Sequence, residues 1–179
     1  MRKVLTICSL AVLTLVVAVL VVRAQQDKSK RPSPPATAKC ELATGKSITI
    51  DYSSPRKKGR AIFTDVVKYG EIWRTGANEA TTFVTNTDLM VGGTHVPAGS
   101  YTLFTVPNKD KWTLVISKKT GEWGTDYPGE KEDLARIDMK AATGPATENF
   151  TISLDKGAKG CTLKIAWDTT VASVEIATM

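Results

Sequence analysis

The residues best suited to chemistry lie between Tyr69 and Thr81, where the sequence reads Y-G-E-I-W-R-T-G-A-N-E-A-T. These thirteen positions combine two aromatic side chains with an arginine, an asparagine and two glutamates. Such a mixture suits a ligand pocket, in which aromatic faces and a few polar groups orient a small molecule. It equally suits a rigid polar corner of a fold. The composition of the segment leaves both interpretations open.

Two further arginines precede this segment, in the run R-K-K-G-R at residues 56–60. Taken alone, this basic run is more typical of a solvated loop than of an anion site. In a cleft, however, its arginines and Arg74 could hold an anionic or sugar group, with the aromatic side chains as stacking faces. The candidate ligand-binding residues are Arg56, Arg60, Tyr69, Trp73, Arg74, Asn78 and Glu79.

The competing interpretation of the same residues is structural. Arg74 and Glu79 flank a bend at Gly76-Ala77, where Gly76 would supply a positive φ angle. A bend of this kind would bring the two charged side chains together as a buried ion pair that accepts a contact from Asn78. The pair would then fix a long connection to the sheet instead of binding a ligand.

The rest of the chemical inventory is small. The chain has one histidine, His95, whereas a structural zinc site needs about four Cys or His ligands and a catalytic one about three. It contains no G-x-S-x-G elbow, P-loop, G-x-G-x-x-G or EF-hand spacing. We therefore expect no metal, no cofactor and no catalytic residue. Carboxylate chemistry on a glycan remains as an alternative, because Glu71 and Glu79 lie beside aromatic residues and would need only a separation of roughly 5–10 Å from another acid.

Alternation with period two dominates the elements that must position these residues. Ile48, Ile50 and Tyr52 alternate with polar residues, and further expected strands include alternating stretches at residues 135–139, 150–154 and 161–167 and a last one at residues 171–177. Gly92-Gly93 is a two-residue hairpin signal. The pattern predicts an all-β domain of about eight or nine antiparallel strands, arranged as a two-sheet sandwich or, alternatively, an open β-barrel.

The first residues resemble an export leader. Met1-Arg2-Lys3 is basic, Val4–Val22 is an uncharged run of nineteen residues, and Val22-Arg23-Ala24 has the spacing that signal peptidase accepts. We predict a signal peptide at residues 1–24 and a periplasmic or secreted protein. Because the run nearly reaches the ~20 residues that span a bilayer, the alternative is an anchor of residues 4–22 in the inner membrane. Residues 25–39 are predicted to be a Pro-rich basic tether, which leaves residues 40–179 as the domain.

The net charge of +6 belongs to the N-terminal segment rather than to the domain. Seven of the 24 basic residues precede Cys40, against one of the 18 acidic residues, so 17 of each remain in the domain. A neutral domain gives no support to nucleic-acid binding. Two cysteines, Cys40 and Cys161, remain after removal of the leader, and in an oxidising compartment they would form either a disulfide or two separate buried thiols.

Three stretches resemble a known family of exported bacterial proteins. They read D-Y-S-S-P-R-x-x-G-R-x-I-F, then Y-G-E-I-W-R-T-G-A-N-E-A-T, then V-P-A-G-S-Y-T-L-F-T-V-P. The family is catalogued as domain of unknown function 2911, and the similarity extends from about Ile48 to the C-terminus. The resemblance implies a secreted or periplasmic β-rich domain and implies no activity. The Cys40 and Cys161 pair is not part of the family pattern.

These observations predict an exported, non-enzymatic β-sandwich domain that binds a small molecule, a glycan or a protein partner at the segment rich in arginine, tryptophan and glutamate. The alternatives are a carboxylate-based glycan-acting enzyme and a purely structural envelope protein. No nucleic acid is expected as a partner, and a membrane only through an uncleaved N-terminal segment.

Overall fold

The computed structural model describes residues 27–43, 45–123 and 126–179, so the predicted leader or anchor lies outside the described residues. The chain divides into two units, residues 1–31 and residues 32–179, which are described separately. In the first unit, Asp27 accepts a hydrogen bond from the Ser29 N–H at 3.0 Å and caps the short turn η1 (Lys28–Lys30). None of the described helices is long enough and apolar enough to cross a membrane.

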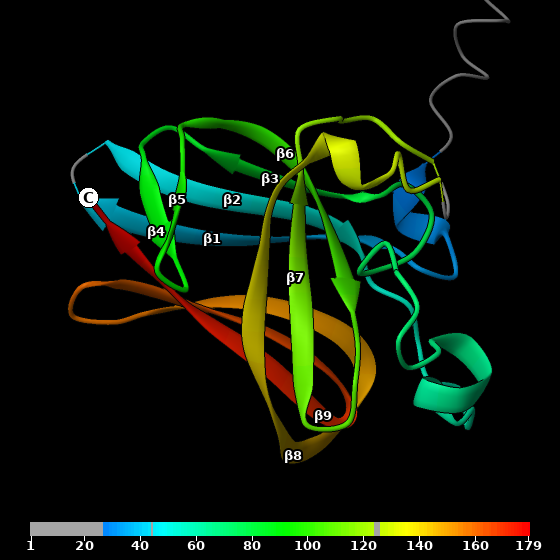
Figure 1. The fold of residues 1–179 in the computed structure, drawn as a ribbon. Coiled ribbons are helices and arrows are strands. Elements are labelled where there is room, and N and C mark those ends of the chain that lie inside the picture. The colour runs from blue at the N-terminus through cyan, green and yellow to red at the C-terminus, as the bar shows by residue number, and fades with distance from the viewer. Residues whose placement is uncertain (1–26, 44, 124–125) are drawn as a thin grey trace, which may run out of the picture. The chain divides into compact units, whose positions relative to one another are not determined.

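The second unit is built from strands, with two short helical turns between them (Figure 1). The turns are η2 (Ile62–Val66) and η3 (Glu130–Glu132). The strands are β1 (Pro35–Ala43), β2 (Lys46–Ser53), β3 (Thr81–Thr85), β4 (Leu89–Val91), β5 (Thr94–Val96), β6 (Gly99–Val106), β7 (Lys111–Ser117), β8 (Asp133–Lys156) and β9 (Gly160–Thr178).

The described strands form one antiparallel sheet in the order β1-β2-β3-β6-β7-β8-β9-β4-β5, which confirms the predicted all-β class. The sheet is not closed into a barrel, since β1 and β5 remain as its edges. It does fold over on itself, because β1 contacts β8 across the interior and Arg56 forms an isolated bridge with Asn149. In Figure 1, β1 and β2 run above the long β8–β9 hairpin.

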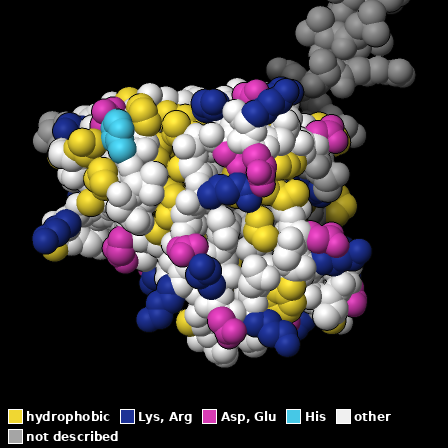
Figure 2. All heavy atoms as spheres, viewed as in Figure 1, with side chains coloured by type: hydrophobic (Ala, Val, Ile, Leu, Met, Phe, Trp, Pro, Cys, Tyr) yellow, Lys and Arg dark blue, Asp and Glu magenta, His cyan; other side chains and the backbone are white. Residues whose placement is uncertain are grey.

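Strand alternation places one face of each strand in the core. Ile48 and Ile50 of β2 are fully buried, as are Leu163 and Ile165 of β9, whereas the residues between them are only partly covered. On the face shown in Figure 2, basic and acidic side chains are interspersed. This agrees with the equal numbers of basic and acidic residues in the domain.

The last strands are longer than the sequence pattern indicated. The alternating stretches expected around residues 135–139 and 150–154 belong to the single strand β8, and those around 161–167 and 171–177 belong to β9. Their pairing continues through register shifts between Thr143 and Thr147 and between Thr147 and Thr151. Such irregularities bend a strand without ending it. The breaks in the alternating sequence pattern therefore mark bends within these strands and not strand ends.

The first strand of the sheet begins before Cys40, the residue at which the predicted domain starts. Strand β1 starts at Pro35, inside the predicted tether of residues 25–39, and Ala38 is buried. The tether prediction relied on the lack of large apolar residues. Alanines suffice here because β1 packs closely, and Pro35 is tolerated as the first residue of an edge strand.

Cys40 of β1 and Cys161 of β9 are joined by a disulfide. Their Cα atoms are 6.7 Å apart, their sequence separation is 121 residues, and both side chains are buried. The bond therefore links the first strand in the sequence to the last one.

Candidate functional site

The connection that leads into β3 is held rigidly on both sides of Arg74. Trp73 and Thr105 of β6 exchange two backbone hydrogen bonds of 2.8 Å. Thr75 is buried, its hydroxyl lies 3.1 Å from the Thr105 hydroxyl, and its carbonyl accepts a 2.7 Å hydrogen bond from the Thr81 hydroxyl. Arg74 therefore projects from a fixed backbone.

This connection also contains unfavourable backbone conformations. Thr75 and Asn78 both have φ of 56°, and for a β-branched residue such as threonine this region costs of the order of 1–3 kcal/mol. Asn78 compensates by donating from Nδ2 to the Ser33 carbonyl at 3.0 Å and to the Ser53 hydroxyl at 3.2 Å. At Gly76, a Cβ atom would lie 3.0 Å from the Ser53 carbonyl oxygen, so the close approach of two backbones requires glycine.

A cavity of about 330 Å³, called the arginine cavity below, opens beside this connection. Its charged lining residues all lie between residues 60 and 74 and are Arg60, Lys68, Glu71 and Arg74. Trp73 and Trp167 supply an aromatic wall. The lining thus carries three cationic side chains and one carboxylate, and Glu71 lies 3.9 Å from Lys68 in a solvent-exposed pair.

Arg74 is the unusual member of this lining. Its side chain is half-buried, and its Nε is shielded from solvent without a hydrogen-bond partner. Among the described contacts it has no ion pair, and the anticipated pairing with Glu79 is not formed. Burial lowers the pKa of the Arg74 guanidinium from its ordinary value. A cation that loses hydration without gaining a counter-charge is costly.

A second cavity, of about 420 Å³ and called the turn cavity below, lies next to the first and shares Ser33 and Arg60 with it. Its other lining residues are Pro32, Arg56 and Lys58. The R-K-K-G-R run, whose simplest interpretation was a solvated loop, is an ordered turn here. Lys58 and Gly59 both have positive φ, and Arg60 N–H donates to the Lys57 carbonyl at 3.1 Å.

The arginine side chains of this turn are held by oxygen atoms that carry no full charge. Arg60 donates from Nε to the Lys57 carbonyl at 3.0 Å and from Nη2 to the Arg56 carbonyl at 2.6 Å. Arg56 donates from Nη1 to the carbonyl and hydroxyl of Ser54. Each guanidinium thus uses two of its five N–H donors and keeps the others available.

Comparison with protein-family models gives one match. The family described as a protein of unknown function (DUF2911) matches residues 33–176. The chain belongs to this family. No curated protein and no solved structure matches the chain. The match begins at Ser33, so the DUF2911 domain includes this residue, which lines both cavities and which the sequence pattern assigned to a tether.

Trp73 of the DUF2911 domain is mainly a core residue. Its ring stacks on Trp167 at 6.0 Å with an interplanar angle of 16°, and it meets Phe150 and Trp112 edge-on at 5.1 and 6.4 Å. The side chain is only 9% exposed. It can therefore offer the arginine cavity a ring edge but no open stacking face.

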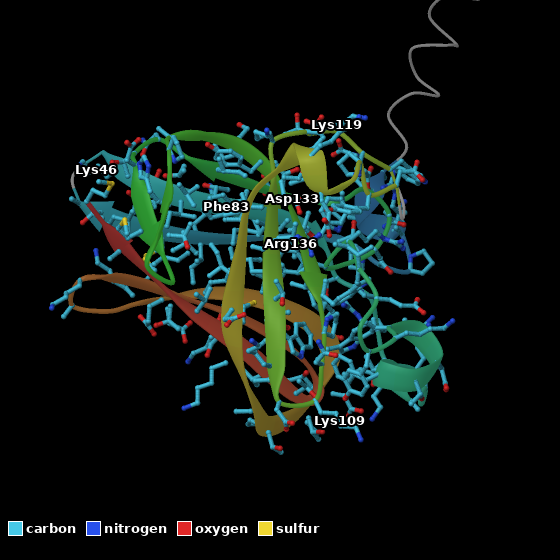
Figure 3. The ribbon with its side chains drawn as sticks, viewed as in Figure 1. Lys46, Phe83, Lys109, Lys119, Asp133 and Arg136 are labelled. Carbon is cyan, nitrogen blue, oxygen red and sulfur yellow. A yellow bond between two sulfur atoms is a disulfide. The ribbon has the colours of Figure 1, made fainter. Side chains whose placement is uncertain are left out.

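Tyr69 lies apart from the two cavities. Its exposed ring stacks on Phe63 at 5.7 Å and lines a separate hollow with the residues of the β6–β7 turn. Lys109 of that turn is labelled in Figure 3, at the end of the two strands. The structure therefore groups five of the seven candidates, Arg56, Arg60, Trp73, Arg74 and Asn78, and leaves Tyr69 outside that group.

Glu79 also lies outside both cavities. Its backbone forms an isolated bridge with Trp123, whose side chain is 58% exposed. Glu71 is consequently the single carboxylate in the lining of the arginine cavity. The glycan-acting alternative requires Glu71 or Glu79 to lie near another acid in a cleft, and the lining of the arginine cavity contains no acid besides Glu71.

The sequence pattern gave no indication of three residues that matter at the site. Lys68 and Trp167 line the arginine cavity, and Ser33 lines both cavities while its carbonyl accepts from Asn78. Ser33 and Trp167 lie far from Arg74 in sequence, so only the fold brings them to the site, whereas Lys68 directly precedes the segment that begins at Tyr69. Glu122 was also missed: it is buried, accepts from the Thr102 hydroxyl at 3.0 Å and lies in a different hollow beside Trp123.

Proposed function

We propose that the DUF2911 domain binds a small molecule carrying a carboxylate or phosphate group in the arginine cavity, and that it does so without catalysing a reaction. The state of Arg74 carries this proposal, since its guanidinium is half-buried, makes no ion pair among the described residues and has a shielded Nε without an acceptor. An anion at the terminal nitrogens would compensate for the lost hydration.

The size and charge of the cavity fit such a ligand. A volume of about 330 Å³ suits a small molecule. Arg60 and Lys68 add two positive charges to that of Arg74 in the lining of the cavity. The edges of Trp73 and Trp167 provide an apolar wall for the uncharged part of the ligand. An acidic sugar or a sugar phosphate meets these requirements.

The same lining favours binding over catalysis. Glycoside cleavage by the common mechanisms uses two carboxyl groups, whereas Glu71 is alone in this cavity. Neither histidine nor cysteine is among its lining residues, so the cavity lacks a histidine base and a cysteine nucleophile.

We infer that binding takes place outside the cytoplasm. Support comes from the apolar run Val4–Val22 with its cleavage-site spacing, and from the Cys40–Cys161 disulfide, since such bonds persist in oxidising compartments. Sequencing the N-terminus of the mature protein tests this: a start at Gln25 in an exported fraction is expected. A protein that keeps Met1 and stays in the cytoplasm would contradict export.

The binding proposal is tested by calorimetric titration of the full-length protein with galacturonate, glucose 6-phosphate and neutral glucose at constant ionic strength. We expect the two anionic sugars to bind and glucose to bind far more weakly. Arg74→Met should weaken anion binding about tenfold or more, because a charge-assisted hydrogen bond is worth about 1.5–3 kcal/mol. Lys46→Met removes an equal charge from the exposed β1–β2 turn (Figure 3) and should leave binding unchanged.

Stability of the same variants distinguishes a binding residue from a structural one. If Arg74 serves to bind a ligand, its replacement should not destabilise the ligand-free protein. The free energy of unfolding of the Arg74→Met variant in anion-free buffer should equal that of the natural protein or exceed it by up to about 1 kcal/mol. A loss of several kcal/mol, or anion binding that survives in the folded variant, would refute the assignment.

A further inference from the structure

The turn cavity extends the arginine cavity in a way that specifies the ligand further. Both cavities are lined by Ser33 and Arg60, so they adjoin one another at these two residues. Arg74 lies in the first cavity, Arg56 and Lys58 in the second, and Arg60 in both. Two cationic centres are therefore placed on either side of a shared arginine.

The charges of the turn cavity are not neutralised by the carboxylates around it. Lys57 is paired with Asp168 at 2.7 Å, and Glu148 accepts a 2.8 Å hydrogen bond from the Lys58 backbone N–H. These are the carboxylates that contact the turn in the described part of the chain. The side chains of Arg56, Lys58 and Arg60 make no ion pair there.

The two arginines of the turn cavity are also held in place before any ligand arrives. Arg60 is fixed by the carbonyls of Lys57 and Arg56, and Arg56 by Ser54. Asn78 donates to the carbonyl of Ser33, which lines both cavities. A site ordered in this way loses little side-chain entropy on binding, which distinguishes it from a cluster of mobile surface lysines.

We propose that the two cavities form one extended site for a molecule with two anionic groups joined by a short spacer, one group at Arg74 and the other at Arg56 and Lys58, with Arg60 between them. This inference rests on the proposed function and adds the second anionic group. An acidic oligosaccharide and a short polyphosphate share this chemistry.

The test holds ligand charge constant and varies the spacing. The full-length protein is titrated with linear dicarboxylates from succinate to suberate and with butyrate as a single-charge reference, all at one ionic strength. We expect an affinity maximum at one chain length, about tenfold or more above butyrate, because the second group binds at a high effective concentration. Digalacturonate against galacturonate, and tripolyphosphate against phosphate, then identify which natural class is preferred.

Lys58→Asn is the decisive variant. It removes the charge while keeping the backbone, since asparagine tolerates the φ of 49° at this position. The Lys58→Asn variant should bind dicarboxylates with an affinity close to that of butyrate, and its affinity for butyrate should be unchanged. The control variant Lys46→Asn should change neither affinity. Arg56→Gln should act like Lys58→Asn.

The outcomes separate the two proposals. Butyrate binding that depends on Arg74, together with a flat dicarboxylate series that is insensitive to Lys58→Asn, would overturn the extended site and leave the arginine cavity intact. Failure of every anion to bind would overturn both.

Discussion

The disulfide between Cys40 and Cys161 should contribute a large share of the stability of this domain. It closes a loop with a sequence separation of 121 residues, and in the chain-entropy model such a closure removes about 16 cal/mol/K from the unfolded ensemble. At 25 °C this corresponds to about 4.9 kcal/mol. Because unfolded chains are compact and measured values are commonly about 2–4 kcal/mol, we take 4.9 as an upper value.

The perturbation is Cys40→Ala with Cys161→Ala, measured by urea unfolding against the oxidised natural pair. Both proteins carry Cys8→Ser, so that no third thiol can exchange. With a urea slope of about 2 kcal/mol/M, the midpoint should fall by about 1–2.5 M. The slope should rise in the variant, since its unfolded chain is no longer cross-linked and exposes more surface.

Reductant provides the internal control. It should lower the midpoint of the oxidised protein nearly to that of the double variant, and should leave the variant itself unaffected. Equal midpoints for the oxidised protein and the double variant would refute the reasoning, because the bond would then place no constraint on the unfolded chain.

Three further perturbations test the core, the electrostatics and the backbone. Trp73→Ala should lower the free energy of unfolding by about 3–5 kcal/mol in urea titrations, since it removes the ring packed on three other aromatic rings; a loss under 1 kcal/mol would contradict a core role. The N–H of Ala98, and then His95, lower the pKa of the Asp88 carboxyl. Asp88→Asn should therefore be less stable than the natural protein above about pH 4, and this difference should vanish as the pH falls through the depressed pKa; a difference that persists at pH 2 would refute it. Gly160→Ala should cost about 1–3 kcal/mol, because a Cβ would lie 1.9 Å from the Ile176 carbonyl oxygen, whereas Gly157→Ala in the same turn meets only an atom at 3.8 Å and should be nearly neutral.

Alternation identified most strands because burial of one sheet face is a local property of the sequence. Ile48 and Ile50 of β2 and Phe83 of β3 are buried as the pattern predicts, and Gly92-Gly93 forms the turn between β4 and β5 with φ of 53° and 84°. Strand β1 escaped detection because its inward residues are small. The lengths of β8 and β9 escaped because a bend and a strand end look alike in sequence.

The site was predictable only in part, since its geometry depends on contacts between distant residues. Arg60 lines the same cavity as Arg74, and Arg56 lines the adjoining one, but the expected bend did not bring Arg74 to Glu79. Positive φ at Thr75 and Asn78 directs the chain differently, and Glu79 lies beside Trp123 instead. Trp167, which is nearly a hundred residues from Arg74, could not be assigned to the cavity without the fold.

The position of the β4–β5 hairpin has a consequence for biosynthesis. Leu89, Met90 and Val91 pair with Thr178, Ala177 and Ile176, so this hairpin is made midway through translation and finds its neighbour only after residues 176–178 leave the ribosome. Until then Leu89, Val91 and Val96, which are buried in the folded domain, lack the cover of the end of β9. Nascent chains should therefore need a chaperone during this interval, and a truncation before Ile176 should yield insoluble protein rather than a slightly weakened domain.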